Sequence, residues 1–166
     1  MQEISKTIPK KTRNSIYYLT INSNMLFKND SDSIAQFHKF EKAVDTIFSE
    51  NNIFDYVTFR DNTIDNLSLI KEVIIDIAYE VAGNQMNRDR IHAHILLAFR
   101  KHKTNIKLNF AKIKADVKHL SDLPSIYFNC QLVQNITTFE EIRNRIQVYG
   151  EKFNLLQNIQ NSNIDN

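Results

Sequence analysis

Residues 72–100 read EVIIDIAYEVAGNQMNRDRIHAHILLAFR, and this stretch decides the fold. It contains two runs, about 73–82 and 90–99, in which apolar residues recur at every second position. Such alternation is typical of β-strands that have one face buried. The segment 83–87 between the runs contains one glycine and two asparagines, which favour turns. The stretch therefore predicts an antiparallel β-hairpin.

The two faces of this hairpin differ in character. Successive side chains of a strand point to opposite faces, so the sequence assigns each residue to one of them. One face is apolar throughout and requires a core: Val73, Ile75, Ile77, Tyr79, Val81, Ile91, Ala93, Ile95, Leu97 and Phe99. The other face gathers the polar residues of the hairpin: Asp76, Ala78, Glu80, His92, His94, Leu96 and Ala98.

A candidate metal site lies on the polar face. A three-residue loop at 85–87 would place Glu80 opposite His92, with Cβ atoms ~5 Å apart. His94 follows on the same face, ~7 Å along the strand. Two imidazoles and a carboxylate suit Mg, Mn or Zn. The alternative is a surface histidine pair that forms salt bridges with Glu80 or Asp76. Asp76 ranks below Glu80 as a ligand because it lies further from the turn, opposite Leu96.

Composition excludes several classes of protein. The 166 residues predict one domain, and 21 basic against 19 acidic residues give a net charge of only +2. A nucleic-acid-binding face would therefore depend on local clusters of charge. The single cysteine, Cys130, cannot form an internal disulfide, so we expect a reducing, intracellular compartment, with host nucleus or cytoplasm left open. We expect no membrane association, because no apolar run approaches ~18 residues.

Only two glycines occur, at positions 83 and 150. A Walker loop and a G-x-G-x-x-G fingerprint each need at least two closely spaced glycines. The sequence therefore excludes both kinds of nucleotide-binding loop in this chain.

The rest of the chain supplies further alternating and helical segments. Strands are predicted at about 15–24, 56–60 and 126–133, in addition to the two of the hairpin. Helices are predicted at about 31–50, 109–120 and 137–150. The order β-α-β-β-β-α-β-α predicts an α+β fold, with an antiparallel five-stranded sheet and helices packed on its faces. We expect a basic N-terminal arm at 1–14, one domain at 15–153 and a C-terminal tail at 154–166.

The last predicted helix contains IQVYGEKFN, in which Tyr149 and Lys152 are three residues apart. Residues at this spacing are neighbours on a helix. A tyrosine close to a metal can act as a nucleophile on phosphorus, and a lysine beside it can offset phosphate charge. The alternative is that Tyr149 belongs to the core, because it continues an apolar helical stripe that includes Ile142 and Ile146.

Three motifs together resemble a known family. An N-terminal strand (here YLTIN, 18–22), an H-U-H strand (His92-Ala93-His94, where U is hydrophobic) and a late helix with Y-x-x-K (Tyr149 to Lys152) occur in that order. The chain resembles the HUH endonuclease domain of rolling-circle replication initiators, the Rep proteins of small single-stranded DNA viruses and plasmids. The resemblance covers about residues 15–153.

The resemblance implies a function and roles for particular residues. It implies an RRM-like HUH fold in which His92, His94 and Glu80 hold Mn²⁺ or Mg²⁺. Tyr149 would attack the scissile phosphodiester of single-stranded DNA at an origin hairpin or stem-loop, forming a covalent 5′-phosphotyrosine and releasing a 3′-OH. Lys152 would assist it. The same linkage would allow rejoining of the nicked strand without ATP.

We expect the DNA to cross the polar face of the sheet. The candidate contacts are polar and aromatic side chains of that face together with nearby basic residues: Tyr18, Thr20, Asn22, Tyr56, Arg60, Arg88, Arg90, Lys101 and Lys103.

The sequence departs from the family in two respects. Ala93 is smaller than the usual hydrophobic residue between the histidines, and the glycine count excludes the helicase domain that many members carry. A helicase or replication partner would then be supplied in trans. Two alternatives stay open: a single-tyrosine transposase of the same superfamily, and a non-catalytic module that binds single-stranded nucleic acid on exposed aromatic residues.

Overall fold

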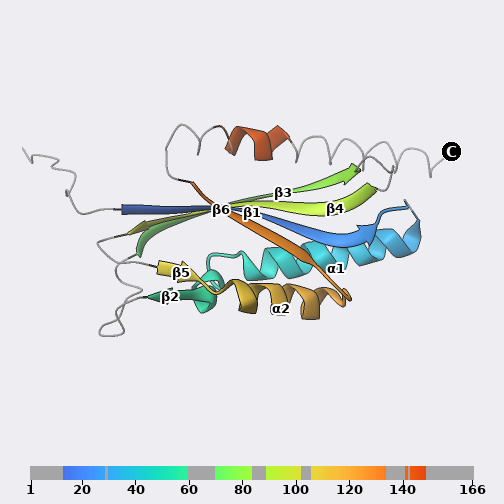
Figure 1. The fold of residues 1–166 in the computed structure, drawn as a ribbon, viewed down its shortest axis with the longest axis horizontal. Helices are drawn as coiled ribbons and strands as arrows, with labels where there is room; N and C mark the ends of the chain where they lie inside the picture. Colours follow the sequence, from blue (N-terminus) through green and yellow to red (C-terminus); the bar gives the residue numbers. More distant parts are fainter. Residues whose placement is uncertain are drawn as a thin grey trace, which may run out of the picture.

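The computed structural model describes residues 13–28, 30–59, 70–83, 89–101, 106–133, 141 and 143–148. In this part of the chain the fold is α+β, as predicted, with an antiparallel sheet of four strands in the order β3-β4-β1-β6 (Figure 1). The strands are β1 (Arg13–Leu26), β3 (Ile70–Gly83), β4 (Asp89–Lys101) and β6 (Tyr127–Val133). All three pairings between neighbours are antiparallel.

The central hairpin has the predicted register. β3 and β4 pair so that Glu80 lies opposite His92 and Asp76 opposite Leu96. The strands are longer than the alternation predicted, and pairing extends to Gly83 opposite Asp89. β1 lies on the other side of β4, with Asn22 opposite His92 and Thr20 opposite His94. The H-U-H strand is therefore an inner strand, flanked by hydrogen-bonded neighbours.

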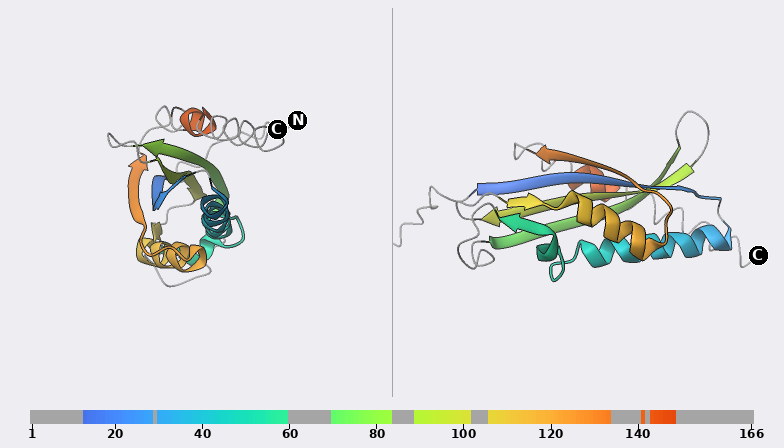
Figure 2. Two further views of the ribbon diagram at one scale, coloured as in Figure 1. Left: turned by 90° about the vertical axis from the view of Figure 1, so that its right-hand side faces the viewer. Right: turned by 60° about the horizontal axis from the view of Figure 1, so that its bottom comes forward.

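Two helices cover one face of the sheet. α1 (Ser31–Ile47) begins after Asp30, whose carboxylate accepts from the backbone N–H of Ser33 at 2.7 Å. α2 (Phe110–Ser121) begins after Asn109, whose side chain accepts from the N–H of Lys112. Figure 2 shows both helices on the same side of the sheet. Their buried residues form the main core with the inward residues of the strands: Phe37, Phe40, Val44, Ile113, Val117, Leu19, Ile21, Ile91, Ile95 and Phe99.

A third helical segment lies on the opposite face. Residues 141 and 143–148 are helical, and we refer to 143–148 as the C-terminal helix. It appears in orange-red on the outer side of the sheet, away from α1 and α2 (Figures 1 and 2). None of the helices that the structure describes has both the length and the apolar character needed to cross a bilayer.

The prediction of a fifth strand in the main sheet is wrong for the described residues. β2 (Val57–Phe59) is only three residues long and pairs with β5 (Ile106–Leu108) in a separate two-stranded sheet. The sequence predicted no strand at β5. Its alternation of buried Ile106, exposed Lys107 and buried Leu108 is too short to predict a strand, although it gives β2 a partner near the core.

Tyr56 does not lie on the polar face of the sheet, which corrects its assignment as a DNA contact. It ends a 3₁₀ helix, η1 (Ile53–Tyr56), and only 7% of its surface is exposed. Its hydroxyl donates to Asp116 of α2 at 2.8 Å, and the Lys112 ammonium lies 4.2 Å from its ring centroid. Burial and the Asp116 carboxylate raise the pKa of Tyr56 to about 12. Tyr56 therefore joins η1 to α2 and has no free ring face for a base.

Candidate metal centre

Glu80, His92 and His94 come together on the outer face of the sheet. One ligand atom from each residue can be chosen so that all of them lie within 4.8 Å of one another. The Glu80 side chain comes from β3 and the two imidazoles from β4, as the hairpin register predicted. A group of two imidazole nitrogens and one carboxylate oxygen fits a divalent cation such as Mn²⁺, Mg²⁺ or Zn²⁺.

His94 is the most enclosed of the three. Only 7% of the surface of His94 is exposed, and its Nε2 atom lies 2.8 Å from Oε2 of Glu80. Its Nδ1 atom lies 2.8 Å from the hydroxyl of Tyr18, and the two rings are nearly parallel, with centroids 6.1 Å apart. Both nitrogens of His94 thus have polar neighbours, and Nε2 is the nitrogen that faces Glu80.

His92 is half-buried, and its ring lies edge-on to that of His94 with centroids 6.3 Å apart. Burial lowers the pKa of His92, and so do the neighbouring charges of His94 and Arg90, whereas Glu80 opposes them. A metal ligand must be the neutral imidazole. The environment of His92 therefore favours the form that could bind a cation.

The lowered pKa of His92 predicts that acid destabilises the metal-free protein. Unfolded His92 would take up a proton near pH 6.5, whereas folded His92 resists it, so protonation favours the unfolded chain. The contribution of this shift to the free energy of unfolding is complete above pH 6.5 and is lost as the pH falls below it. Urea unfolding in EDTA should show that His92→Asn loses less stability than wild type between about pH 7.5 and about pH 5. An equal loss in both proteins would contradict the shift.

Asp76 is engaged elsewhere, consistent with its lower rank as a ligand. Its Oδ2 atom lies 2.9 Å from Nε of Arg143, which belongs to the C-terminal helix. On the same side of the helix, Ile146 is 3% exposed and packs in a small apolar cluster with Ile16, Ala78, Leu96 and Ala98. The outer face thus has two parts: an apolar part that docks this helix, and a polar part that carries the candidate metal ligands.

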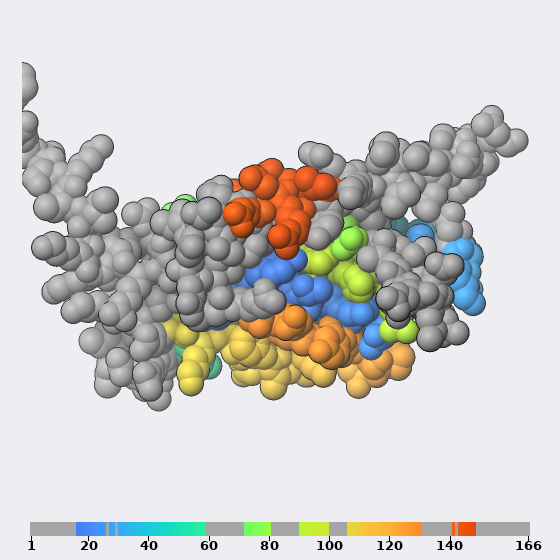
Figure 3. All heavy atoms as spheres, turned by 45° about the horizontal axis from the view of Figure 1, so that its top comes forward, coloured from blue at the N-terminus to red at the C-terminus, as the bar shows by residue number. Residues whose placement is uncertain are grey.

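The helix docks close to the candidate metal ligands. Ala78, which belongs to the same apolar cluster as Ile146, is the Cα partner of His94, and Leu96 is two residues along β4 from His94. Figure 3 shows the C-terminal helix lying directly over strands of the sheet. The sequence signalled this contact through the apolar helical stripe that includes Ile142 and Ile146, of which Ile142 lies outside the described residues.

The Ile146 contact predicts a local effect of truncation. Ile146→Ala should weaken docking of the C-terminal helix by about 2 kcal/mol, which corresponds to about 30-fold faster amide hydrogen exchange in residues 143–148. Val148→Ala is the matched control, because Val148 is 47% exposed and packs in neither core cluster. Equal exchange rates in the two variants would show that Ile146 does not dock the helix.

Some of the other predicted site residues lie beside the two histidines, and the rest lie away from them or outside the described part of the chain. Thr20 and Asn22 lie on β1 opposite the two histidines, and both are half-buried. Tyr18 is also half-buried, and its hydroxyl lies 2.8 Å from Nδ1 of His94. Arg90 donates from Nη1 to Oδ1 of Asn24 at 3.0 Å. Lys101 ends β4, but its side chain is outside the described part, as are Arg60, Arg88, Lys103, Tyr149 and Lys152.

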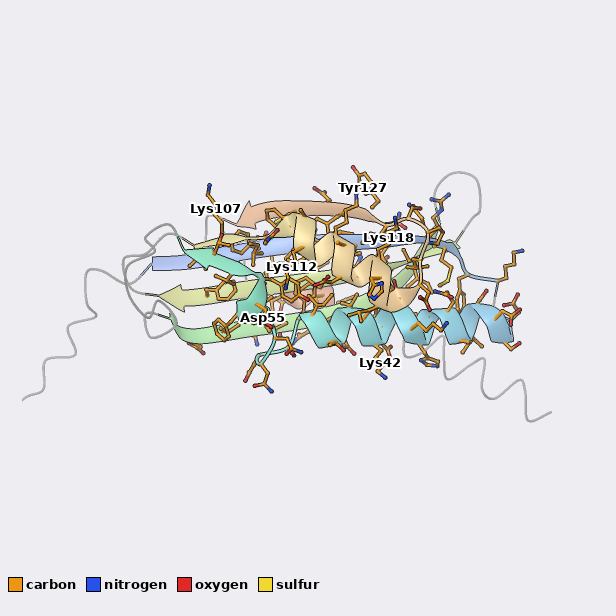
Figure 4. The ribbon with its side chains drawn as sticks, turned by 90° about the horizontal axis from the view of Figure 1, so that it is seen from below. Lys42, Asp55, Lys107, Lys112, Lys118 and Tyr127 are labelled. Atoms are coloured by element: carbon orange, nitrogen blue, oxygen red, sulfur yellow. The ribbon has the colours of Figure 1, made fainter. Side chains whose placement is uncertain are left out.

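Tyr127 is an exposed aromatic residue that extends the polar face. It lies on the edge strand β6 opposite Asn22 and is 65% exposed. Figure 4 shows its side chain projecting away from the body of the sheet. Asn129, also exposed, follows on the same face opposite Thr20. A row of side chains therefore runs across the sheet from Tyr127 through Asn22 and His92 to Glu80.

Comparison of the chain with protein-family models, with curated protein sequences and with solved structures found no match.

Proposed function

We propose that this chain is a divalent-metal-dependent endonuclease of the HUH type, which nicks and rejoins single-stranded DNA through a covalent tyrosine. The observation that carries the proposal is the convergence of Glu80, His92 and His94 within 4.8 Å on neighbouring strands. The four-stranded antiparallel sheet, with the H-U-H strand inside it and two helices behind it, is compatible with the RRM-like fold of that family.

The C-terminal helix supports an approach of Tyr149 to this site. Arg143 contacts Asp76, and Ile146, three residues later, packs in the apolar cluster that contains Ala78, Leu96 and Ala98. The helix is therefore docked on the sheet face that carries Glu80, His92 and His94. In the sequence, Tyr149 follows Ile146 by three residues. Tyr149 lies outside the described residues, and its place at the site is part of the proposal.

The proposed reaction is an in-line displacement at phosphorus. Oη of Tyr149 forms a bond to the scissile phosphorus as the bond from phosphorus to the 3′-oxygen breaks. The tyrosine proton passes to solvent, and the departing oxygen takes up a proton to become a 3′-OH. Lys152 would offset charge on the phosphate. The bound metal would supply Lewis-acid polarisation of a phosphate oxygen. Attack by a 3′-OH on the phosphotyrosine reverses these steps and rejoins the strand.

The polar row that ends in Tyr127 provides a path for the single strand. Tyr127 offers an open ring on which a base can stack, worth about 1–3 kcal/mol in comparable sites. Thr20, Asn22 and Asn129 offer hydrogen bonds along the way. The Lys112 and Lys118 side chains of α2 lie on the opposite side of the sheet (Figure 4). We therefore expect strand contacts to come from the outer face, not from α2.

A covalent-adduct assay tests the proposal. The full chain is incubated with a random-sequence pool of single-stranded DNA, labelled at its 3′ end, with Mn²⁺ or with EDTA. Because the 5′-phosphate of the 3′ fragment would remain on the protein, label should migrate with the protein through denaturing electrophoresis in Mn²⁺ only. A non-catalytic binding module would release all label on denaturation. Absence of any adduct in Mn²⁺ would reject the nuclease.

A further inference from the structure

His94 is held from both sides by groups with different hydrogen-bonding capacity. Its Nε2 atom lies 2.8 Å from a Glu80 oxygen, and its Nδ1 atom lies 2.8 Å from the Tyr18 hydroxyl. Tyr18 belongs to β1, where its Cα partner on β4 is Leu96, so its side chain reaches diagonally along the face to His94. The side chain of His94 is 9% exposed, and solvent therefore supplies little of its hydrogen bonding.

These contacts determine where the imidazole carries its proton when no metal is bound. An ionised carboxylate can only accept hydrogen bonds, so Nε2 must carry a hydrogen to bond with Glu80. A neutral imidazole has one N–H, which leaves Nδ1 as an acceptor. The Tyr18 hydroxyl then donates its hydrogen to Nδ1.

Metal binding requires the other tautomer. A cation held by Glu80, His92 and His94 needs the lone pair of Nε2, because Nε2 is the nitrogen that faces Glu80. The imidazole releases the Nε2 proton to solvent and takes one up at Nδ1, so its charge does not change. The new Nδ1–H needs an acceptor. The oxygen of Tyr18 can accept it after the hydroxyl hydrogen turns to another partner.

We propose that Tyr18 is a positioning residue for the metal centre, which holds the His94 ring in place and accepts the Nδ1–H of its metal-binding tautomer. A backbone carbonyl could serve only the metal-bound tautomer, whereas a hydroxyl serves both. Through the contact of its hydroxyl with Nδ1, Tyr18 thus orients Nε2 toward Glu80 and stabilises the proton arrangement that a cation needs. This inference depends on the metal site of the proposed function.

The first test is the affinity for Mn²⁺ alone, measured by the loss of the free-ion electron paramagnetic resonance signal. Tyr18→Phe keeps the aromatic ring and removes only the hydroxyl. Outer-shell partners of this kind contribute about 10–100-fold to metal affinity, so the dissociation constant should rise by that factor. Tyr17→Phe is the matched control, because the buried Tyr17 hydroxyl donates to the carbonyl of Ile106 in the main core. Tyr17→Phe should bind Mn²⁺ as wild type does.

The second test observes the tautomer itself. Nitrogen chemical shifts of histidine-labelled wild type should place the His94 proton on Nε2 in EDTA and on Nδ1 with Zn²⁺, which is diamagnetic and suits the same ligands. Zn²⁺ found on Nδ1 would overturn the inference, and so would equal Mn²⁺ affinity of Tyr18→Phe and wild type. If that equality is found while wild type still forms the Mn²⁺-dependent adduct, only the role of Tyr18 fails. If wild type binds no Mn²⁺, the metal site and this inference fail together.

Discussion

Replacing His94 by alanine is expected to abolish Mn²⁺ binding and, with it, Mn²⁺-dependent formation of the DNA adduct. His94 is the most enclosed of the three candidate ligands, and its Nε2 atom is directed at Glu80 at 2.8 Å. Without it, two ligands on facing strands remain. The loss of Mn²⁺ affinity should exceed the roughly 10–100-fold typical of outer-shell residues, because a donor atom itself is removed.

His94→Ala should also lower the free energy of unfolding, and this effect must be separated from the loss of Mn²⁺ binding. Glu80 and the Tyr18 hydroxyl each lose a hydrogen bond to His94, which predicts a destabilisation of about 1–3 kcal/mol. His94→Gln keeps a polar side chain in the space and should recover part of that stability without recovering metal affinity. His38→Ala is the control, because His38 is an exposed histidine of α1 on the far side of the sheet.

Isothermal titration with Mn²⁺ and thermal unfolding of the same samples separate these effects. We expect His94→Ala and His94→Gln to be folded and unable to bind Mn²⁺, and His38→Ala to bind as wild type does. If a folded His94→Ala variant bound Mn²⁺ with wild-type affinity, His94 would not be a metal ligand.

The hairpin was the part of the fold that the sequence predicted best, because its information is local. Only a few residues separate two strands whose alternation puts a continuous apolar set on one face, and a slip by one residue would expose that set. The pairing of Glu80 with His92 follows from that register and is confirmed. Whether the pair binds a metal stays a prediction.

Contacts between distant segments were predicted poorly for the opposite reason. Alternation assigns Tyr18 to the face of His94 but does not give the register of β1 against β4, which sets their diagonal contact. The three residues of β2 were assigned to the main sheet because nothing in them identifies a partner, and β5, itself only three residues long, was missed. Tyr56 was misplaced along with β2, since its actual partner, Asp116, is 60 residues away.

The docking of the C-terminal helix was predicted in part, because it depends on a local pattern and also on a contact between distant segments. The sequence predicted a helix with Ile146 on its apolar side, and Ile146 is buried as expected. The ion pair of Arg143 with Asp76 was not predicted, because it joins residues far apart in the chain. Together the two contacts dock this helix on the outer face of the sheet, over β3 and β4.

This docking leads to the second large effect, the expected loss of all covalent adduct in Tyr149→Phe. The substitution removes one oxygen, which is the atom proposed to bond to phosphorus, so no linkage can form at this position. The candidate ligands Glu80, His92 and His94 are unchanged, so Mn²⁺ affinity should equal that of wild type. Tyr149→Phe also keeps the ring, which preserves any packing that the aromatic side chain makes.

Tyr127→Phe is the matched control for Tyr149→Phe. Tyr127 is the most exposed tyrosine of the described residues and lies in the same row of the sheet as His92. Its ring is proposed to stack on a base, so removal of its hydroxyl should leave adduct formation within about 3-fold of wild type, because stacking uses the ring face. The pair of variants therefore separates nucleophilic attack from binding of the strand.

Mass spectrometry of the trapped wild-type adduct then identifies the linked residue. We expect the nucleotide on the peptide that contains Tyr149 and a free 3′-OH on the other fragment. A nucleotide on Tyr18 or Tyr127 would assign the nucleophile to the sheet and overturn the role of the C-terminal helix, while the metal-dependent reaction itself would stand. Adduct in Tyr149→Phe at the wild-type level would do the same. Either result would mean that the helix docked by Ile146 and Arg143 serves to cover the sheet next to the metal ligands, not to deliver the attacking oxygen.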